Sequence, residues 1–261
     1  MVHGFRGDHH GLDGLASRLT AHRVIVPDLP GFGESGSLSG EHNLVGLADW
    51  LITFIDSLSL DSYVLVGHSF GSLIVTQAIS RGLTPNLLVL LNPISSPALD
   101  GPRSILTRGA LAYYELGRML PNKAADGLLR NRAIVRMMSE VMAKTKDRKL
   151  RAWIHDQHDQ FFSQYTDRQS LLEAFRASIS HTVVEFVPSL NMPTLLICGS
   201  QDDISPLRDQ LKFARMLPRS EFHIVRDVGH LVHYEGVTQS VLVLTRFLSN
   251  HLTSVTHSPI P

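Results

Sequence analysis

The chain has 261 residues, 43% of them hydrophobic, which is enough to bury one sizeable core. Its 24 basic residues are balanced by 24 acidic ones, so the overall charge gives no footprint for nucleic acid or an anionic membrane. No secretory signal or membrane-spanning run is predicted, and a single cysteine, Cys198, excludes a disulfide framework. We therefore expect a cytoplasmic protein that acts on a small molecule, without nucleic-acid partners or membrane insertion.

In the first third of the chain, short apolar runs alternate with helical patterns. Strands are predicted at 23–27, 62–66 and 87–91, and helices at 44–58 and 71–81. This alternation is typical of the α/β class, in which helices cover both faces of a mostly parallel sheet. Residues 1–94 are expected to form the first part of the core.

The alternation stops at residues 95–192, which we interpret as a helical lid. This segment has no strong strand pattern, and it contains five of the seven methionines. It carries fourteen basic and ten acidic residues, a charge that could attract an anionic acyl substrate or could be a solvated surface. The methionines, with Trp153, Phe161 and Phe162, could line a substrate pocket or form the core of the lid itself.

The alternation resumes after the lid. Strands are predicted at 194–198 and 222–225, and helices at 206–217 and 237–252. The second part of the core is expected to span residues 193–252, followed by a flexible tail at 253–261.

A G-x-S-x-G motif, Gly67-His68-Ser69-Phe70-Gly71, lies between a predicted strand and a predicted helix. A nucleophile on such a sharp turn adopts strained backbone angles, so small residues must flank it, and the helix N-terminus favours negative charge beside it. An isolated match would be read as a chance event in a loop, but the strand and helix favour Ser69 as a nucleophile.

Serine is a poor nucleophile until a base takes its proton and a third group orients that base. Two later strands each end in a loop with suitable residues: Asp202 and Asp203 follow one strand, and His230 follows the next. His233 lies where the last helix is expected to begin, so His230 is the predicted base. Both aspartates are candidates for the acid.

Other histidines and glycines could suggest a metal or a nucleotide. The side chain of His68 should point away from that of its neighbour Ser69, so we interpret it as structural. Four further histidines, His9, His10, His155 and His158, show no recognisable metal-ligand spacing with a carboxylate. The glycines at 31 and 33 lack the third glycine of a dinucleotide loop. We predict no cofactor and no metal.

Together these motifs resemble the α/β-hydrolase family over nearly the whole chain, except for the lid. The resemblance rests also on His3-Gly4-Phe5-Arg6-Gly7 and on the turn at 28–35. It implies a Ser-His-Asp hydrolase whose acid comes three residues after the strand-ending Gly199, which favours Asp202 over Asp203. The other position where the family keeps its acid holds Asn92. The resemblance also implies an oxyanion hole formed by the backbone N–H groups of Phe5 and Phe70.

One departure from the family is large, because the family has two or three strands before the His-Gly loop. Only Met1 and Val2 remain of the last of them. The loss of a central strand would leave hydrogen bonds of its neighbours unpaired, so we expect that the natural protein begins further upstream.

The expected activity is hydrolysis of an ester-like bond, a carboxylic ester or a thioester, through an acyl-enzyme. Ser69 argues against family members that use aspartate as nucleophile. C–C hydrolases of the family often have tryptophan after the base, where this chain has Leu231, a candidate substrate contact. C–C hydrolysis, a lyase of the menaquinone-pathway type and a non-catalytic ligand-binding protein stay open as alternatives.

Overall fold

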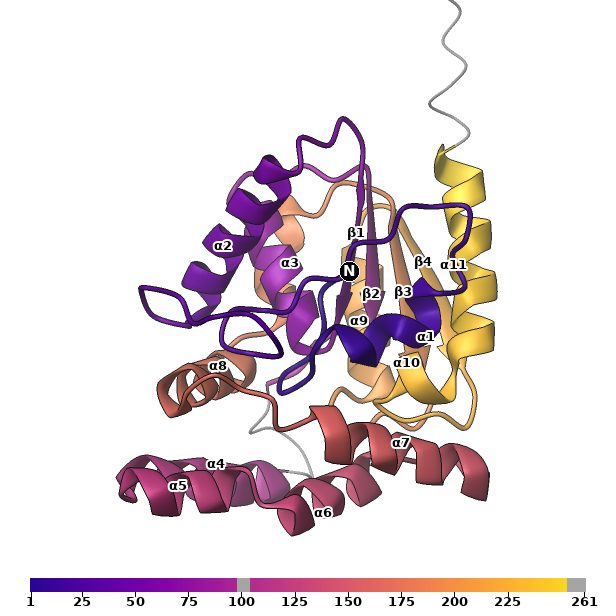
Figure 1. The fold of residues 1–261 in the computed structure, drawn as a ribbon. Coiled ribbons are helices and arrows are strands. Elements are labelled where there is room, and N and C mark those ends of the chain that lie inside the picture. The colour runs from indigo at the N-terminus through magenta and orange to yellow at the C-terminus, as the bar shows by residue number, and fades with distance from the viewer. Residues whose placement is uncertain (98–103, 253–261) are drawn as a thin grey trace, which may run out of the picture.

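The computed structural model describes residues 1–97 and 104–252 (Figure 1). Four parallel strands form one sheet in the order β1-β2-β3-β4. The strands are β1 (Val64–His68), β2 (Leu87–Leu91), β3 (Thr194–Gly199) and β4 (Ser220–Val225). All residues of β2 and β3 are buried, as expected for the central strands of a parallel sheet that is covered on both faces. The predicted α/β class is confirmed.

Alternate side chains of the strands serve two separate apolar layers. Leu88 and Leu90 point to one layer, and Val89 and Leu91 point to the other. The first layer is covered by α2 (Leu44–Ser57), α3 (Phe70–Ser80) and α9 (Leu207–Met216). The second is covered by α1 (Asp13–Ala16) and α11 (Val237–Leu252), which lie on the opposite side of the sheet in Figure 1. Two single-turn helices, η1 (His9–Leu12) and α10 (Val232–Glu235), stand in the loops.

The predicted strand at residues 23–27 is wrong, since this segment joins no ladder. In space, Met1 and Val2 lie between this segment and β1. The Met1 ammonium donates to Ile25 O at 2.7 Å, and the Val2 N–H donates to Val66 O of β1 at 2.7 Å. Two residues are too few to hydrogen-bond a strand along its length. An upstream continuation of the natural chain stays a prediction.

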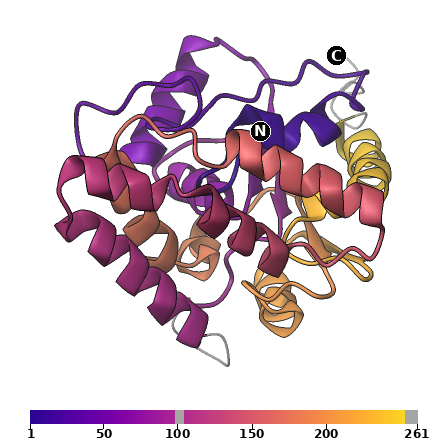
Figure 2. The same ribbon diagram turned by 60° about the horizontal axis from the view of Figure 1, so that its bottom comes forward.

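A helical insertion lies between β2 and β3, and it crosses the end of the sheet where β1 leads into α3 (Figures 1 and 2). Its helices are α4 (Ser104–Met119), α5 (Asn122–Leu129), α6 (Arg132–Met142), α7 (Arg148–Phe161) and α8 (Arg168–Ser180). Side chains of Asn131, Asp147 and Asp167 cap the first turns of the last three. The short helix η2 (Val183–Ser189) returns the chain to β3.

Within the described residues, no helix has both the length and the apolar character needed to cross a membrane. The predicted flexible tail at 253–261 lies outside the described residues.

Candidate active site

Ser69 occupies the sharp turn between β1 and α3 with φ 52° and ψ −118°, a strained conformation for a residue with a side chain. The flanking glycines permit the turn, because a Cβ on Gly67 would lie 2.7 Å from Gly71 O, and one on Gly71 would collide with Val2 O. The Ser69 N–H donates to Leu91 O at 3.1 Å, which anchors the turn to β2.

The three side chains predicted as a triad lie together. Ser69 Oγ is 2.7 Å from His230 Nε2. His230 Nδ1 lies 3.1 and 3.0 Å from the two carboxylate oxygens of Asp202. Because the carboxylate accepts the Nδ1–H, the lone pair of His230 is held at Nε2, where it faces the serine hydroxyl. This is the tautomer that a general base requires.

The two neighbouring aspartates have different surroundings. The Asp202 side chain is fully buried, and its Oδ1 also accepts the N–H groups of Ile204 and Ser205 at 2.9 and 3.1 Å. Gln210 Nε2 lies 3.2 Å from Asp202 Oδ2. Asp203 instead forms an ion pair with Lys144 at 2.5 Å. Of the two carboxylates, Asp202 is the one that meets the base.

Asn92 ties the acid and base loops together, a role that the sequence did not suggest. It is fully buried at the end of β2 with φ 43°. Its Oδ1 accepts the Gly199 N–H at 2.7 Å, and its Nδ2 donates to Gly229 O at 2.8 Å. One amide therefore sets the spacing between the loop that carries Asp202 and the loop that carries His230. The only sequence signal was its position after a buried strand.

The loop with Phe5 runs beside the nucleophile. A Cβ on Gly4 would lie 3.3 Å from Ser69 Cβ, so the backbone leading into Phe5 passes next to the serine. Phe70 is the first residue of α3, and its N–H has no carbonyl one helical turn earlier to bond. Both predicted oxyanion donors therefore belong to backbone that adjoins Ser69.

The His3 ring connects this loop to Leu29 by hydrogen bonds. Its Nε2 accepts the Leu29 N–H at 2.9 Å, so the proton is on Nδ1, which lies 2.9 Å from Gly4 O. Burial lowers the pKa of His3 to about 4, which keeps the ring neutral.

Arg6 joins the same loop to the helical insertion, a role that no sequence pattern predicted. Its side chain is 2% exposed, and its backbone has φ 63°. The guanidinium donates to Leu129 O at 2.7 Å, Phe162 O at 3.1 Å, Ser163 Oγ at 3.1 Å and Tyr114 Oη at 3.2 Å. All four acceptors are neutral groups of the insertion, so Arg6 fastens the insertion to the Phe5 loop.

A cavity of about 930 Å³ opens in front of Ser69, between the core and the insertion. Phe162 and Leu231 line it, with Met137 and Met142 from α6. The prediction is wrong for the other two candidate substrate contacts, Trp153 and Phe161, which do not line this cavity. Trp153 is 42% exposed and packs edge-on against Tyr234, while Phe161 stacks on His10 at 3.9 Å. Both are on α7, and the periodicity of the helix turns them away from the cavity.

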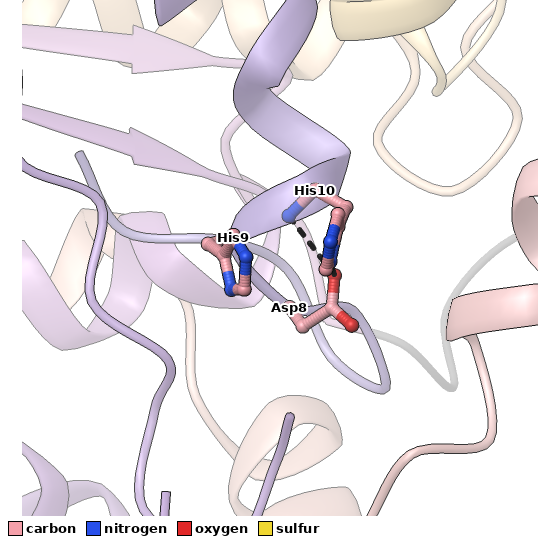
Figure 3. A group of neighbouring side chains, drawn as sticks. All are labelled: Asp8, His9 and His10. Atoms are coloured by element: carbon pink, nitrogen blue, oxygen red, sulfur yellow. Dashed lines mark hydrogen bonds and ion pairs between the residues drawn. The ribbon is translucent and has the colours of Figure 1, made fainter. Parts of the chain in front are cut away.

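Asp8, His9 and His10 have ligand atoms within 4.8 Å of one another, a group that linear spacing did not reveal (Figure 3). The two rings lie 3.9 Å apart at 32°. His9 Nδ1 is 2.9 Å from Asp28 Oδ1, and His10 Nδ1 is 3.2 Å from Asp8 Oδ1. Hydrogen bonding to the two carboxylates accounts for this cluster.

The remaining histidines considered from sequence are buried. His68 Nε2 lies 3.2 Å from His230 O, and burial lowers the pKa of His68 to about 3. The His233 ring lies 3.9 Å from the His68 ring at an angle of 52°, so it contacts His68 and does not replace His230 beside Ser69. His155 and His158 meet at Ser139 within the insertion.

Comparison with known proteins places the chain in a family. The model of the "Alpha/beta hydrolase family" matches residues 1–239. A 2-hydroxy-6-oxo-2,4-heptadienoate hydrolase of Pseudomonas putida is 28% identical over 88% of this chain and 80% of its own length. The acetyltransferase component of an acetoin cleaving system from Pseudomonas putida is 27% identical over 96% of this chain, which spans 63% of that protein.

Solved structures agree with this assignment. A thermophilic esterase from Thermogutta terrifontis is 25% identical, with a TM-score of 0.75 over 96% of this chain and 89% of the esterase. An enol-lactonase from Burkholderia xenovorans has a TM-score of 0.76 at 15% identity over 95% of this chain and 90% of its own, which shows a common fold. This chain belongs to the α/β-hydrolase family, and it is a hydrolase of that family.

Proposed function

We propose that this protein is a serine hydrolase that cleaves a carboxylic ester or thioester of a small molecule through an acyl-enzyme. The observation that carries the proposal is the 2.7 Å contact between Ser69 Oγ and His230 Nε2 at the floor of the cavity. The buried carboxylate of Asp202 supports it, because it holds the base in the reactive tautomer.

In the proposed reaction, Ser69 Oγ attacks the carbonyl carbon while His230 Nε2 takes the hydroxyl proton. The oxyanion that forms accepts hydrogen bonds from the N–H groups of Phe5 and Phe70. When the tetrahedral intermediate collapses, His230 returns the proton to the departing alcohol or thiol. A water molecule, deprotonated by the same histidine, then attacks the acyl-serine and releases the acid.

The cavity wall favours a substrate with a largely apolar acyl group. Ile134, Met137 and Met142 contribute apolar surface from α6, so we propose that the insertion serves as the lid. Of the cations at the wall, Lys144 is paired with Asp203 and Arg208 with Asp209, while the donors of Arg6 are used by four neutral acceptors.

The test is intact mass after the folded protein is exposed to a fluorophosphonate. A single adduct on the wild type that disappears in Ser69→Ala is expected, because only an activated serine reacts. The same substitution should lower kcat/KM for 4-nitrophenyl esters by a factor on the order of 10⁶. Thr76→Ala, at a buried hydroxyl further along α3, is the control and should keep the adduct. A folded wild type that stays unlabelled would overturn the proposal.

A second candidate, C–C bond hydrolysis, has support from two relatives. Besides the heptadienoate hydrolase, a 2-hydroxymuconate semialdehyde hydrolase of Pseudomonas is 24% identical over 88% of this chain. Ring-fission products of this type absorb visible light, so their decay can be followed directly. Turnover of such a dienoate with a kcat/KM above that for the esters would favour the second candidate.

A further inference from the structure

A row of four polar side chains runs through the helical insertion toward the cavity. Ser139, His155 and His158 are each 3% exposed or less. Ser139 Oγ lies 2.6 Å from His155 Nδ1 and 2.7 Å from His158 Nδ1. On the other side of His155, its Nε2 is 3.1 Å from Glu140 Oε1, a charge contact that lacks hydrogen-bond geometry. The order is therefore Glu140, His155, Ser139, His158, from the surface inward.

Glu140 is the charged, outermost member of this row. It is half-exposed and also pairs with Arg136 at 3.3 Å and with Arg151 at 2.9 Å. Burial opposes ionisation of Glu140, but His155, Arg136 and Arg151 favour the charged carboxylate and together lower the pKa of Glu140. A carboxylate that is ionised at neutral pH can only accept hydrogen bonds.

The Glu140 carboxylate determines which atoms donate and which accept hydrogen bonds in His155, Ser139 and His158. Burial, with Arg136 next, lowers the pKa of His155, so this ring is neutral at neutral pH and carries one proton. The negative carboxylate 3.1 Å away favours a proton on Nε2 over a lone pair there, so Nδ1 is an acceptor. Ser139 has a single hydroxyl hydrogen, which it donates to His155 Nδ1. Its oxygen is then left to accept from His158 Nδ1–H.

His158 is therefore held in the tautomer with a proton on Nδ1 and a lone pair on Nε2. Burial lowers the pKa of His158 to about 4, so the ring is neutral at neutral pH. His158 lines the cavity, and no described residue forms a hydrogen bond with its Nε2. An imidazole lone pair in a mostly apolar cavity loses free energy when it has no donor.

We propose that His158 Nε2 is a substrate-recognition site of this hydrolase, which accepts a hydrogen bond from a neutral hydroxyl group on the acyl part of the substrate. This inference rests on the proposed function for the identity of the cavity, and it assigns the substrate class, a hydroxylated acyl group. A neutral hydroxyl fits better than an ammonium, because among the described residues no carboxylate forms a hydrogen bond or ion pair with His158, which contacts Ser139, Phe162 and Tyr234.

The first experiment measures the tautomer in the wild-type protein without any turnover. Nitrogen-15 NMR at neutral pH, with the His158 signals identified by their loss in His158→Gln, should show protonated Nδ1 and unprotonated Nε2. On addition of 3-(4-hydroxyphenyl)propanoate or its 3-hydroxyphenyl isomer, the Nε2 signal should shift, and 3-phenylpropanoate should leave it in place. A proton on Nε2 in the free protein, or no shift with either phenol, would overturn the proposal.

The second experiment compares the 4-nitrophenyl esters of the same three acids. For the better phenol, we expect wild-type kcat/KM to exceed that of the unsubstituted ester by about tenfold, the contribution of one buried hydrogen bond. The ratio of the two values should fall to about one in His158→Phe, which keeps a ring but has no acceptor, and be partly kept in His158→Gln. Trp153→Phe, on the outer side of α7, is the matched control and should keep the ratio. An equal ratio in wild type and His158→Phe would refute the assignment.

The two experiments separate this proposal from the proposed function. If no fluorophosphonate adduct forms and no ester is cleaved, the hydrolase proposal fails, while the NMR result still decides the tautomer and hydroxyl binding at His158. If esters are cleaved but neither readout responds to the hydroxyl, only the His158 assignment fails.

Discussion

The core and the helical insertion meet at one cavity, but they contribute to it in different ways. On the core side, backbone geometry dominates: Ser69 sits in a strained turn between glycines, and Asn92 spans two loops through its amide. On the insertion side, long side chains dominate, with Arg6 reaching into it from the core and His158 oriented through Ser139. The reactive atoms therefore depend on short, local constraints, whereas the shape and polarity of the cavity depend on packing between distant segments.

The core side can be tested most strongly at the acid. Asp202→Asn should lower kcat/KM for esters by about 10⁴-fold, because an amide can hold His230 in the wrong tautomer. Asp203→Asn is the matched control, and it should change kcat/KM by about twofold at most, the usual effect of a partly exposed substitution. Steady-state kinetics on both variants, with circular dichroism for folding, makes the comparison. Equal losses would show that the two carboxylates share the role.

The junction between the two regions can be broken at Arg6. Arg6→Met leaves the buried carbonyl of Leu129 and the partly buried carbonyl of Phe162 without this donor, so we expect the free energy of unfolding to fall by about 3 kcal/mol. We also expect kcat/KM to fall by about 10²-fold, because the loop with Phe5 loses its attachment. Urea unfolding and ester kinetics measure the two effects. Arg18→Met is the control, since its guanidinium bonds only to Gly14 O on an exposed helix in the described structure. Wild-type kinetics in Arg6→Met would contradict the link between insertion and loop.

Within the core, the bridge between the loops can be cut at Asn92. Asn92→Ala should lower the free energy of unfolding by about 2 kcal/mol, because a buried N–H and a buried C=O lose their partner. It should also lower kcat more than it raises KM, since the spacing of Asp202 and His230 changes. Asn86→Ala, at an exposed amide that bonds Ser62 and Tyr63, should lower stability and leave kcat unchanged. If kcat is the same in Asn92→Ala and Asn86→Ala, the hydrogen bonds of Asn92 do not contribute to catalysis.

The two regions can also be compared by how the free energy of unfolding depends on pH, a change that leaves the catalytic groups in place. Burial lowers the pKa of His68 in the core to about 3 and that of His158 in the insertion to about 4, from the usual 6.5. The unfolded chain takes up protons below about pH 6.5 and these folded rings do not, so stability falls as pH drops from there toward the folded pKa values. Each ring contributes up to about 1.4 kcal/mol per pH unit. Urea unfolding across this range should give a shallower decline in His158→Phe and in His68→Phe, and an unchanged slope in both would exclude this origin.

The sequence by itself determined the features that depend on neighbouring residues. Apolar runs and helical spacing predicted the four strands of the sheet and its main helices, because burial imposes a period on side chains close together in the chain. The G-x-S-x-G turn was readable because its residues are adjacent in the chain, although only Gly67 is required by a near neighbour, Gly71 O, while Gly71 leaves room for the distant Val2 O. The strand predicted at residues 23–27 failed because a strand exists only with a partner, and partners are not local.

Only the tertiary structure decided which side chains meet. Asp202 and Asp203 are adjacent in sequence, and what separates them is the position of His230 on another loop and of Lys144 on the insertion. Trp153 and Phe162 share the same composition cue, but only Phe162 reaches the cavity. The polarity of His158 follows from Glu140 through two intermediate side chains, a relation that needs distances between two helices. Such contacts arise when segments far apart in the chain pack together, and a pattern along one segment carries no record of them.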